Sequence, residues 1–85
     1  MVALSFGSTA SASGVTVTPG CTTIEVGNNT GVEVEVEIGG VPLGTVSDGT
    51  SETFIAGYDG EGFIEVAVIS TLNDTVFFTD FVQEN

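Results

Sequence analysis

The clearest pattern in the chain is a strict alternation of apolar and acidic residues over 32–38, which reads Val-Glu-Val-Glu-Val-Glu-Ile. Successive side chains of a β-strand point to opposite faces, so this pattern predicts a strand with one buried apolar face and one acidic face. Gly39 and Gly40 follow directly, and such a pair is typical of a two-residue hairpin turn with positive φ angles. We therefore expect the returning strand of a hairpin over 41–47.

Five further segments rich in Val, Ile, Phe and Thr predict additional strands, over 15–18, 21–26, 50–56, 63–70 and 75–82. Turn signals separate them, and Asp48-Gly49 predicts a second two-residue hairpin, between 41–47 and 50–56. No stretch shows the 3.6-residue period of a helix. Short strands with turns every 8–12 residues predict an all-β fold: a small antiparallel β-sandwich of about seven strands, immunoglobulin-like or jelly-roll-like.

The two expected hairpins also predict which residues share a face. A two-residue turn pairs Ile38 with Val41 and, in the second hairpin, Leu43 with Phe54. The buried face of 32–38 is then expected to gain four residues from the following strands: Val41, Leu43, Phe54 and Ala56. Val46 and Ile55 are expected on the acidic side.

The first 14 residues differ from the rest of the chain, because they are small and polar apart from Val2, Leu4 and Phe6. The first carboxylate is Glu25. We expect residues 1–14 to form an extended N-terminal arm, with room for one short strand, and residues 15–85 to form the single sandwich domain. Val2, Leu4 and Phe6 are candidates for contact with another chain.

The last strand pair, over 63–70 and 75–82, is apolar on both faces. One interpretation is a central pair of strands buried on both sides. The other is that one face is an assembly interface, because an exposed apolar patch on a small domain usually marks a contact site. The candidate residues for that interface are Phe63, Ile69, Phe77 and Phe81.

The charge of the chain is entirely negative. Twelve residues are Asp or Glu, none is Lys, Arg or His, and the formal net charge is −12 over 85 residues. Nucleic-acid binding is excluded because it depends on cationic contacts to phosphates, and anionic membrane surfaces are excluded for the same reason. No apolar run is long enough for membrane insertion. The hydrophobic content of 41% is too high for an acidic disordered tail.

The same composition argues against enzymatic chemistry. A serine or cysteine nucleophile needs a base, most often His, and the chain has none. Cys21 is the single cysteine, so no disulfide can form within the chain, and we expect a buried free thiol. The acidic segments Asp59-Gly60-Glu61 and Asp48 to Glu52 lack the spacing of a calcium loop. We therefore expect no catalytic residue, no metal site and no cofactor.

The acidic row of Glu33, Glu35 and Glu37 leaves three interpretations open. Same-face neighbours in a strand lie roughly 6.5–7 Å apart, so the three carboxylates repel one another. The row can be a solvated face, a cation-binding row or a docking face for a basic partner. Separately, Asn28-Asn29-Thr30 and Asn73-Asp74-Thr75 fit the N-glycosylation sequon and fall in predicted loops.

Two resemblances suggest a setting. Gly31 to Phe54, with its glycine turn, its Leu43-Gly44-Thr45-Val46 strand and its Thr53-Phe54 strand, resembles small immunoglobulin-like or PEGA-like surface modules. The composition is similar to that of acidic proteins from halophilic archaea and their viruses, including capsid decoration proteins. The resemblances imply a non-enzymatic structural protein on a virion surface or in another extracellular lattice, in a high-salt or marine environment. Its partners would be further copies of itself and other capsid or surface-lattice proteins.

Other classes of function remain open. The chain can be a subunit of an extracellular filament, an adhesin-like binding module or an acidic inhibitor of a basic protein. A carbohydrate-binding module usually presents exposed Trp or Tyr side chains, and this chain has no Trp and only Tyr58.

Overall fold

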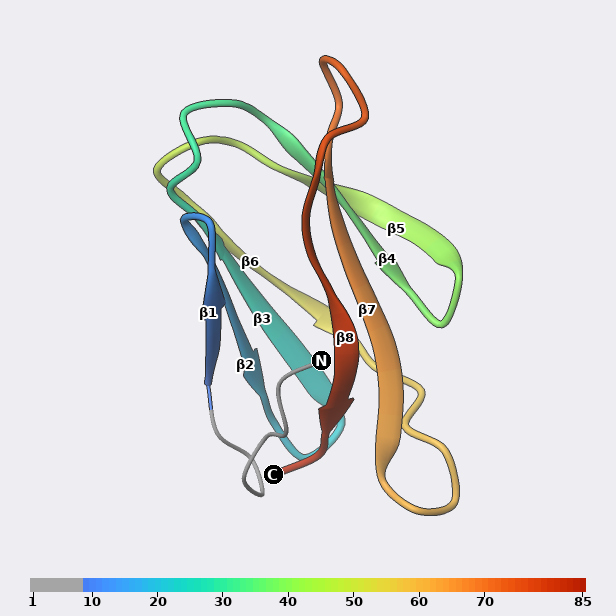
Figure 1. Cartoon of the computed structure of the whole chain (residues 1–85). Coiled ribbons are helices and arrows are strands. Elements are labelled where there is room, and N and C mark those ends of the chain that lie inside the picture. Colours follow the sequence, from blue (N-terminus) through green and yellow to red (C-terminus); the bar gives the residue numbers. More distant parts are fainter. Residues whose placement is uncertain (1–8) are drawn as a thin grey trace.

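Two four-stranded antiparallel sheets make up the computed structural model, which describes residues 9–85 (Figure 1). The first sheet contains, in spatial order, β1 (Ala10–Ala12), β2 (Val15–Pro19), β3 (Thr23–Asn28) and β6 (Ser51–Ile55). The second contains β5 (Val41–Val46), β4 (Val34–Ile38), β7 (Phe63–Ser70) and β8 (Val76–Gln83). The predicted small all-β sandwich is confirmed, with eight strands in the described residues. Val2, Leu4 and Phe6 lie outside the described residues.

The core lies between the facing sides of the two sheets. Val17 and Val26 from the first sheet and Val36 and Val68 from the second are fully buried. The predicted alternation of β4 is confirmed, because Val34, Val36 and Ile38 all belong to this core. Phe54, Tyr58, Ile64 and Phe77 pack against its margin.

The β4–β5 hairpin turns where the sequence predicts it. Gly39 and Gly40 have φ angles of 62° and 81°, and Ile38 pairs with Val41 across them. The expected register continues through the next pair, Glu37 with Pro42. It then breaks, because Val36 pairs with Gly44 instead of Leu43. Leu43 is the extra residue of a β-bulge, and a bulge re-aims the side chains that follow it.

Part of the predicted buried face is therefore wrong. From the bulge onward the faces change: Leu43 is 43% exposed, whereas Val46, expected on the acidic side, is fully buried. Val41 lies before the bulge and keeps its predicted pairing with Ile38, but it is 54% exposed on the edge strand β5.

Phe54 and Ala56 do face the core. Ile55, expected on the acidic side, is exposed but lies on β6 of the first sheet, away from the glutamates of β4. The buried residues of β5 and β6 therefore come from a register that the turn signals did not predict.

The second predicted hairpin is also wrong, because β5 and β6 lie in different sheets and β6 pairs with β3. The backbone N–H of Asn28 donates to the carbonyl of Thr50 at 2.9 Å, and the N–H of Gly49 donates to the carbonyl of Asn28 at 2.7 Å. These two bonds hold the 47–50 turn against the end of β3. The turn therefore carries the chain across the sandwich instead of folding β6 back on β5.

The side chain of Asn28 joins both sheets from a buried position. Its amide nitrogen donates to the carbonyls of Val32 at 2.7 Å and Val46 at 2.9 Å. Its amide oxygen accepts from the backbone N–H of Thr30 at 3.0 Å and from the Thr30 hydroxyl at 2.7 Å. Asn28 is thus the last residue of a strand with its amide fully engaged, and it cannot accept a glycan in the folded chain. Asn73, in the second sequon, is exposed.

Both ends of the described chain are tied to the first sheet. Within the expected arm over 1–14, Ala10–Ala12 forms β1, and Ala10 pairs with Val17 of β2. At the other end, the backbone N–H of Asn85 donates to the carbonyl of Gly20 at 3.0 Å. The expectation of a buried thiol is wrong, because Cys21 lies in the exposed β2–β3 turn.

Replacing Asn28 by Ala tests its role in joining the sheets. The N28A variant leaves the carbonyls of Val32 and Val46 without their donor, so the free energy of unfolding should fall by about 2–4 kcal/mol. Urea unfolding measures the loss. The matched control is Asn29→Ala at an exposed neighbouring position, where we expect a change within about 0.5 kcal/mol. Equal losses in the two variants would refute the role given to Asn28.

Candidate interaction surface on the second sheet

The side of the second sheet that faces away from the core carries most of the residues singled out from the sequence. We call it the outer face. Its cross-strand neighbours follow from the register: Glu35 lies between Thr45 and Ile69, and Ile69 pairs in turn with Val76. In the next row, Glu37 lies between Pro42 and Ala67, which pairs with Thr79. The acidic positions of β4 therefore pair with uncharged positions on β5 and β7.

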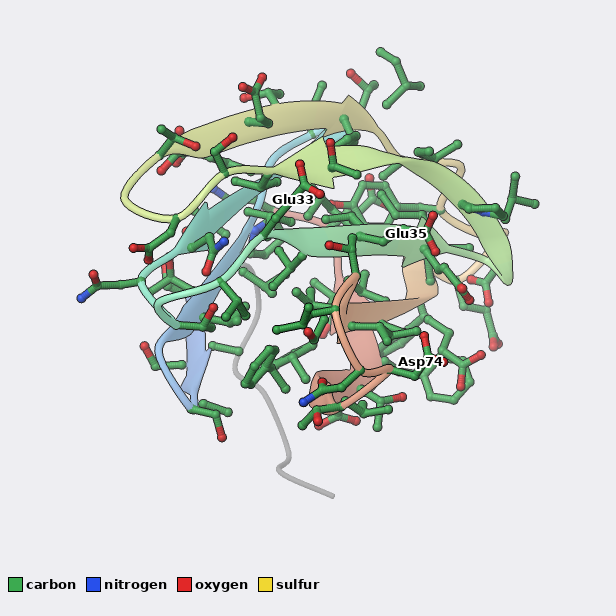
Figure 2. The ribbon with its side chains drawn as sticks, turned by 90° about the horizontal axis from the view of Figure 1, so that it is seen from above. Glu33, Glu35 and Asp74 are labelled. Carbon is green, nitrogen blue, oxygen red and sulfur yellow. The ribbon has the colours of Figure 1, made fainter. Side chains whose placement is uncertain are left out.

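The acidic row is present on this face. Glu35 and Glu37 alternate with the buried valines of β4, and Glu33 directly precedes the strand. Figure 2 looks down on this end of the sandwich, with Glu33 and Glu35 beside β4 and Asp74 in the β7–β8 turn. The Glu33 carboxylate accepts a hydrogen bond from the Thr71 hydroxyl at 3.0 Å.

One further carboxylate belongs to this surface. Glu65 lies on the outer face of β7, diagonal to Glu37, because Glu37 pairs with Ala67 two residues along β7. The sequence contained the signal for it, since Glu65 alternates in step with Phe63, Ala67 and Ile69. With Glu65, the acidic row consists of four glutamates: Glu33 directly before β4, Glu35 and Glu37 on β4, and Glu65 on the neighbouring β7.

Beside the acidic row lies an apolar patch, formed by Phe63, Ile69, Val76 and Phe81. Phe63, Val76 and Phe81 are 37%, 53% and 52% exposed, and Ile69 is half-buried. Ile69 pairs directly with Val76. Phe63 pairs with Gln83, which makes Phe81 its diagonal neighbour, and diagonal neighbours are within reach of aromatic side chains. The patch follows β7 and β8 and is interrupted by Glu65.

Phe77 does not belong to this patch, although the sequence placed it there. Val68 pairs with Phe78 and Ile69 with Val76, so Phe77 is the extra residue of a second bulge. Its half-buried side chain packs against the core, and Val76 takes the outer position instead. The sequence did contain a signal for this bulge. The three consecutive apolar residues at 76–78 do not alternate with polar ones, as a regular strand with one exposed face would require.

The acidic loop at 59–61 has a structural task. The Asp59 carboxylate accepts hydrogen bonds from the backbone N–H groups of Phe63 at 3.0 Å and Glu61 at 2.8 Å. These two donors, Phe63 first, hold the pKa of Asp59 below its ordinary value. In residues 9–85, no group of three or more possible metal ligands comes together. Over the same range, no helix is long and apolar enough to cross a membrane.

Tyr58 is also used within the fold. Its hydroxyl donates to the carbonyl of Thr23 at 2.9 Å, and its ring packs against the core. Burial is the main cause that raises the pKa of the Tyr58 phenol above its ordinary value. The ring is therefore half-buried and does not stand out as a flat platform for a sugar.

Comparison with known protein families, with curated proteins and with solved structures finds no match.

The acidic row predicts that salt stabilises the protein. The Debye length is about 10 Å in 0.1 M salt and about 3 Å in 1 M salt, so glutamates roughly 6.5–7 Å apart repel strongly only in the first condition. We expect the Tm to rise by about 4–8 °C between the two, the shift that about 1 kcal/mol produces in a domain of this size. Circular dichroism melts in sodium chloride measure it.

Two variants separate the acidic row from other effects of salt. Glu35→Gln removes the central charge of the row and should raise the Tm in 0.1 M salt while reducing the further rise at 1 M. The control is Glu25→Gln on the first sheet, where the cross-strand neighbours are Thr18 and Thr53. A flat melting profile, or equal effects of E35Q and E25Q, would contradict this explanation.

Proposed function

We propose that the chain is a non-enzymatic structural protein, a subunit of an oligomer or lattice that makes its contacts through the outer face of the second sheet. The observation that carries the proposal is the apolar patch of Phe63, Ile69, Val76 and Phe81 beside four glutamates, on a chain without a single cationic side chain. Exposed apolar side chains grouped on a small domain mark a contact surface.

The physical basis is a balance between apolar burial and charge repulsion. Burying one large apolar side chain contributes about 1.5–3 kcal/mol. A copy with a net charge of −12 repels a second copy in dilute salt, and dissolved salt screens that repulsion. The subunit therefore assembles in high salt, where the apolar contribution is no longer opposed.

A virion exterior or another extracellular lattice, in a high-salt or marine environment, fits this balance. The partners are further copies of the chain and other capsid or surface-lattice proteins. The strand orders support an immunoglobulin-like module. The order β2-β3-β6 corresponds to the A, B and E strands that such sandwiches pair in one sheet. The order β5-β4-β7-β8 corresponds to the C, F and G strands of the other sheet with C′ added beside C. The decoration role and the halophilic source rest on the composition alone.

A second candidate is an acidic inhibitor of a basic protein. It is favoured by the four outer-face glutamates, Glu33, Glu35, Glu37 and Glu65, whose spacing suits a row of cationic side chains on a partner. Its contacts weaken as salt rises, whereas contacts of the apolar patch strengthen. The adhesin alternative has no comparable support, since the tyrosine that an adhesin would use is half-buried in this fold.

The test replaces exposed apolar residues on opposite sheets. Phe81→Ser removes an aromatic side chain from one end of the patch, and Val76→Ser removes an aliphatic side chain from the other end. We expect both variants to shift the protein from oligomer toward monomer in 1 M salt by about tenfold in dissociation constant, the effect of about 1.4 kcal/mol. Size-exclusion chromatography with light scattering measures the mass.

The matched control is Ile55→Ser. Ile55 is 75% exposed but lies on β6 of the first sheet, so its loss should leave association unchanged. Circular dichroism confirms that each variant is folded. If F81S and V76S associate like the unmodified chain, or if I55S is affected equally, the outer face is not the contact surface.

A further inference from the structure

The turn between β7 and β8 is fully exposed and has no task in the proposed function. Every residue from 71 to 75 is exposed, and Leu72 is 77% exposed. Figure 1 shows this turn projecting beyond the other loops at its end of the sandwich. It contains Asn73-Asp74-Thr75, one of the two sequons of the sequence. A glycan acceptor must lie on such a surface loop.

We propose that Asn73 is an N-glycosylation site, which receives its glycan from an oligosaccharide linked to a polyprenyl diphosphate, and that Asn28 is not. This inference rests on the proposed function for the extracellular setting in which such a transfer takes place. In the transfer, the side-chain nitrogen of Asn73 forms a bond to the anomeric carbon of the first sugar. The bond between that carbon and the phosphate oxygen breaks, the amide loses one proton, and polyprenyl diphosphate leaves.

The hydrogen bonds of the turn leave the reacting nitrogen of Asn73 available. The side-chain oxygen of Asn73 accepts from the backbone N–H of Thr75 at 3.1 Å. Main-chain bonds close the turn, from the N–H of Ser70 to the carbonyl of Thr75 at 2.8 Å and from the N–H of Asp74 to the carbonyl of Ser70 at 3.1 Å. Within residues 9–85, neither the Nδ2 of Asn73 nor the hydroxyl of Thr75 makes a hydrogen bond. Attaching a glycan therefore breaks no bond of the described fold.

The first sequon has the opposite arrangement at each of these groups. Asn28 is 3% exposed, and its Nδ2 donates to the carbonyls of Val32 and Val46. Thr30, the threonine of this sequon, donates its hydroxyl to the amide oxygen of Asn28 at 2.7 Å. An enzyme reaches the nitrogen of Asn28 only after this junction of the two sheets opens, and local opening costs free energy. The fold therefore selects one of the two sequons.

Glycan transfer to the purified, folded chain tests the site. The chain is incubated with a single-subunit oligosaccharyltransferase and an oligosaccharide linked to a polyprenyl diphosphate. Intact mass and peptide mapping then identify the modified positions. We expect one glycan per chain, at Asn73, added at least about ten times faster than at Asn28, because only Asn28 requires local unfolding.

Controls separate the effect of the fold from the preference of the enzyme. Unfolded peptides covering 24–34 and 69–79 carry the same two sequons without the sandwich, and we expect both to be modified. In the folded chain, Asn73→Gln removes the acceptor nitrogen from its position, and Thr75→Val removes the sequon hydroxyl while keeping the shape of the side chain. Both variants should stay unmodified, and circular dichroism confirms that they are folded.

Three results would overturn the inference. The first is a folded chain that stays unmodified while the 69–79 peptide is modified, because the fold then hides Asn73. The second is a 69–79 peptide that the enzyme does not modify. The third is equal transfer to both positions of the folded chain, or a 24–34 peptide that stays unmodified, because the fold then selects nothing. The proposed function is decided separately, by the mass of the unmodified chain in 1 M salt.

Discussion

The lack of any positively charged side chain is the constraint on which the rest of the structure depends. Twelve carboxylates have no internal counter-charge, so they are kept out of the interior of the sandwich, which is built mainly from valine. The polar groups that remain inside must then be satisfied by neutral partners. Asn28 meets this need where the sheets join, because its amide bonds both the 30–32 loop and β5 without introducing a charge.

The same constraint divides the surface. The outer side of the first sheet presents Thr16, Thr18 and Thr53 around Glu25, and residues 1–24 contain no carboxylate. The second sheet instead carries a row of four glutamates directly beside exposed aromatic and aliphatic side chains. Neither salt bridges nor burial can relieve this row within one copy. Relief must come from dissolved salt, a cation or a neighbour, and the apolar patch supplies a reason for the neighbour.

Local patterns in the sequence were sufficient for the β4 strand and its Gly39-Gly40 turn, because alternation and turn conformation depend on neighbouring residues alone. They failed at Leu43 and Phe77, where a bulge shifts the faces of the residues that follow, and at Asp48-Gly49. That dipeptide does form a turn, but its direction is set by bonds to Asn28, some twenty residues away. The acidic row was predictable for the same local reason as β4, whereas the makeup of the apolar patch depended on the bulge in β8.

Sedimentation velocity of the unmodified protein tests the central claim most directly: that a domain without internal counter-charge is completed by its neighbours once salt screens its charge. The measurement covers a range of protein concentrations in 0.05 M and in 1 M sodium chloride. The account predicts a monomer of 8.6 kDa at low salt and a sedimentation coefficient that rises with concentration at high salt. A monomer at every concentration in both salts, or association that is lost as salt rises, would contradict it.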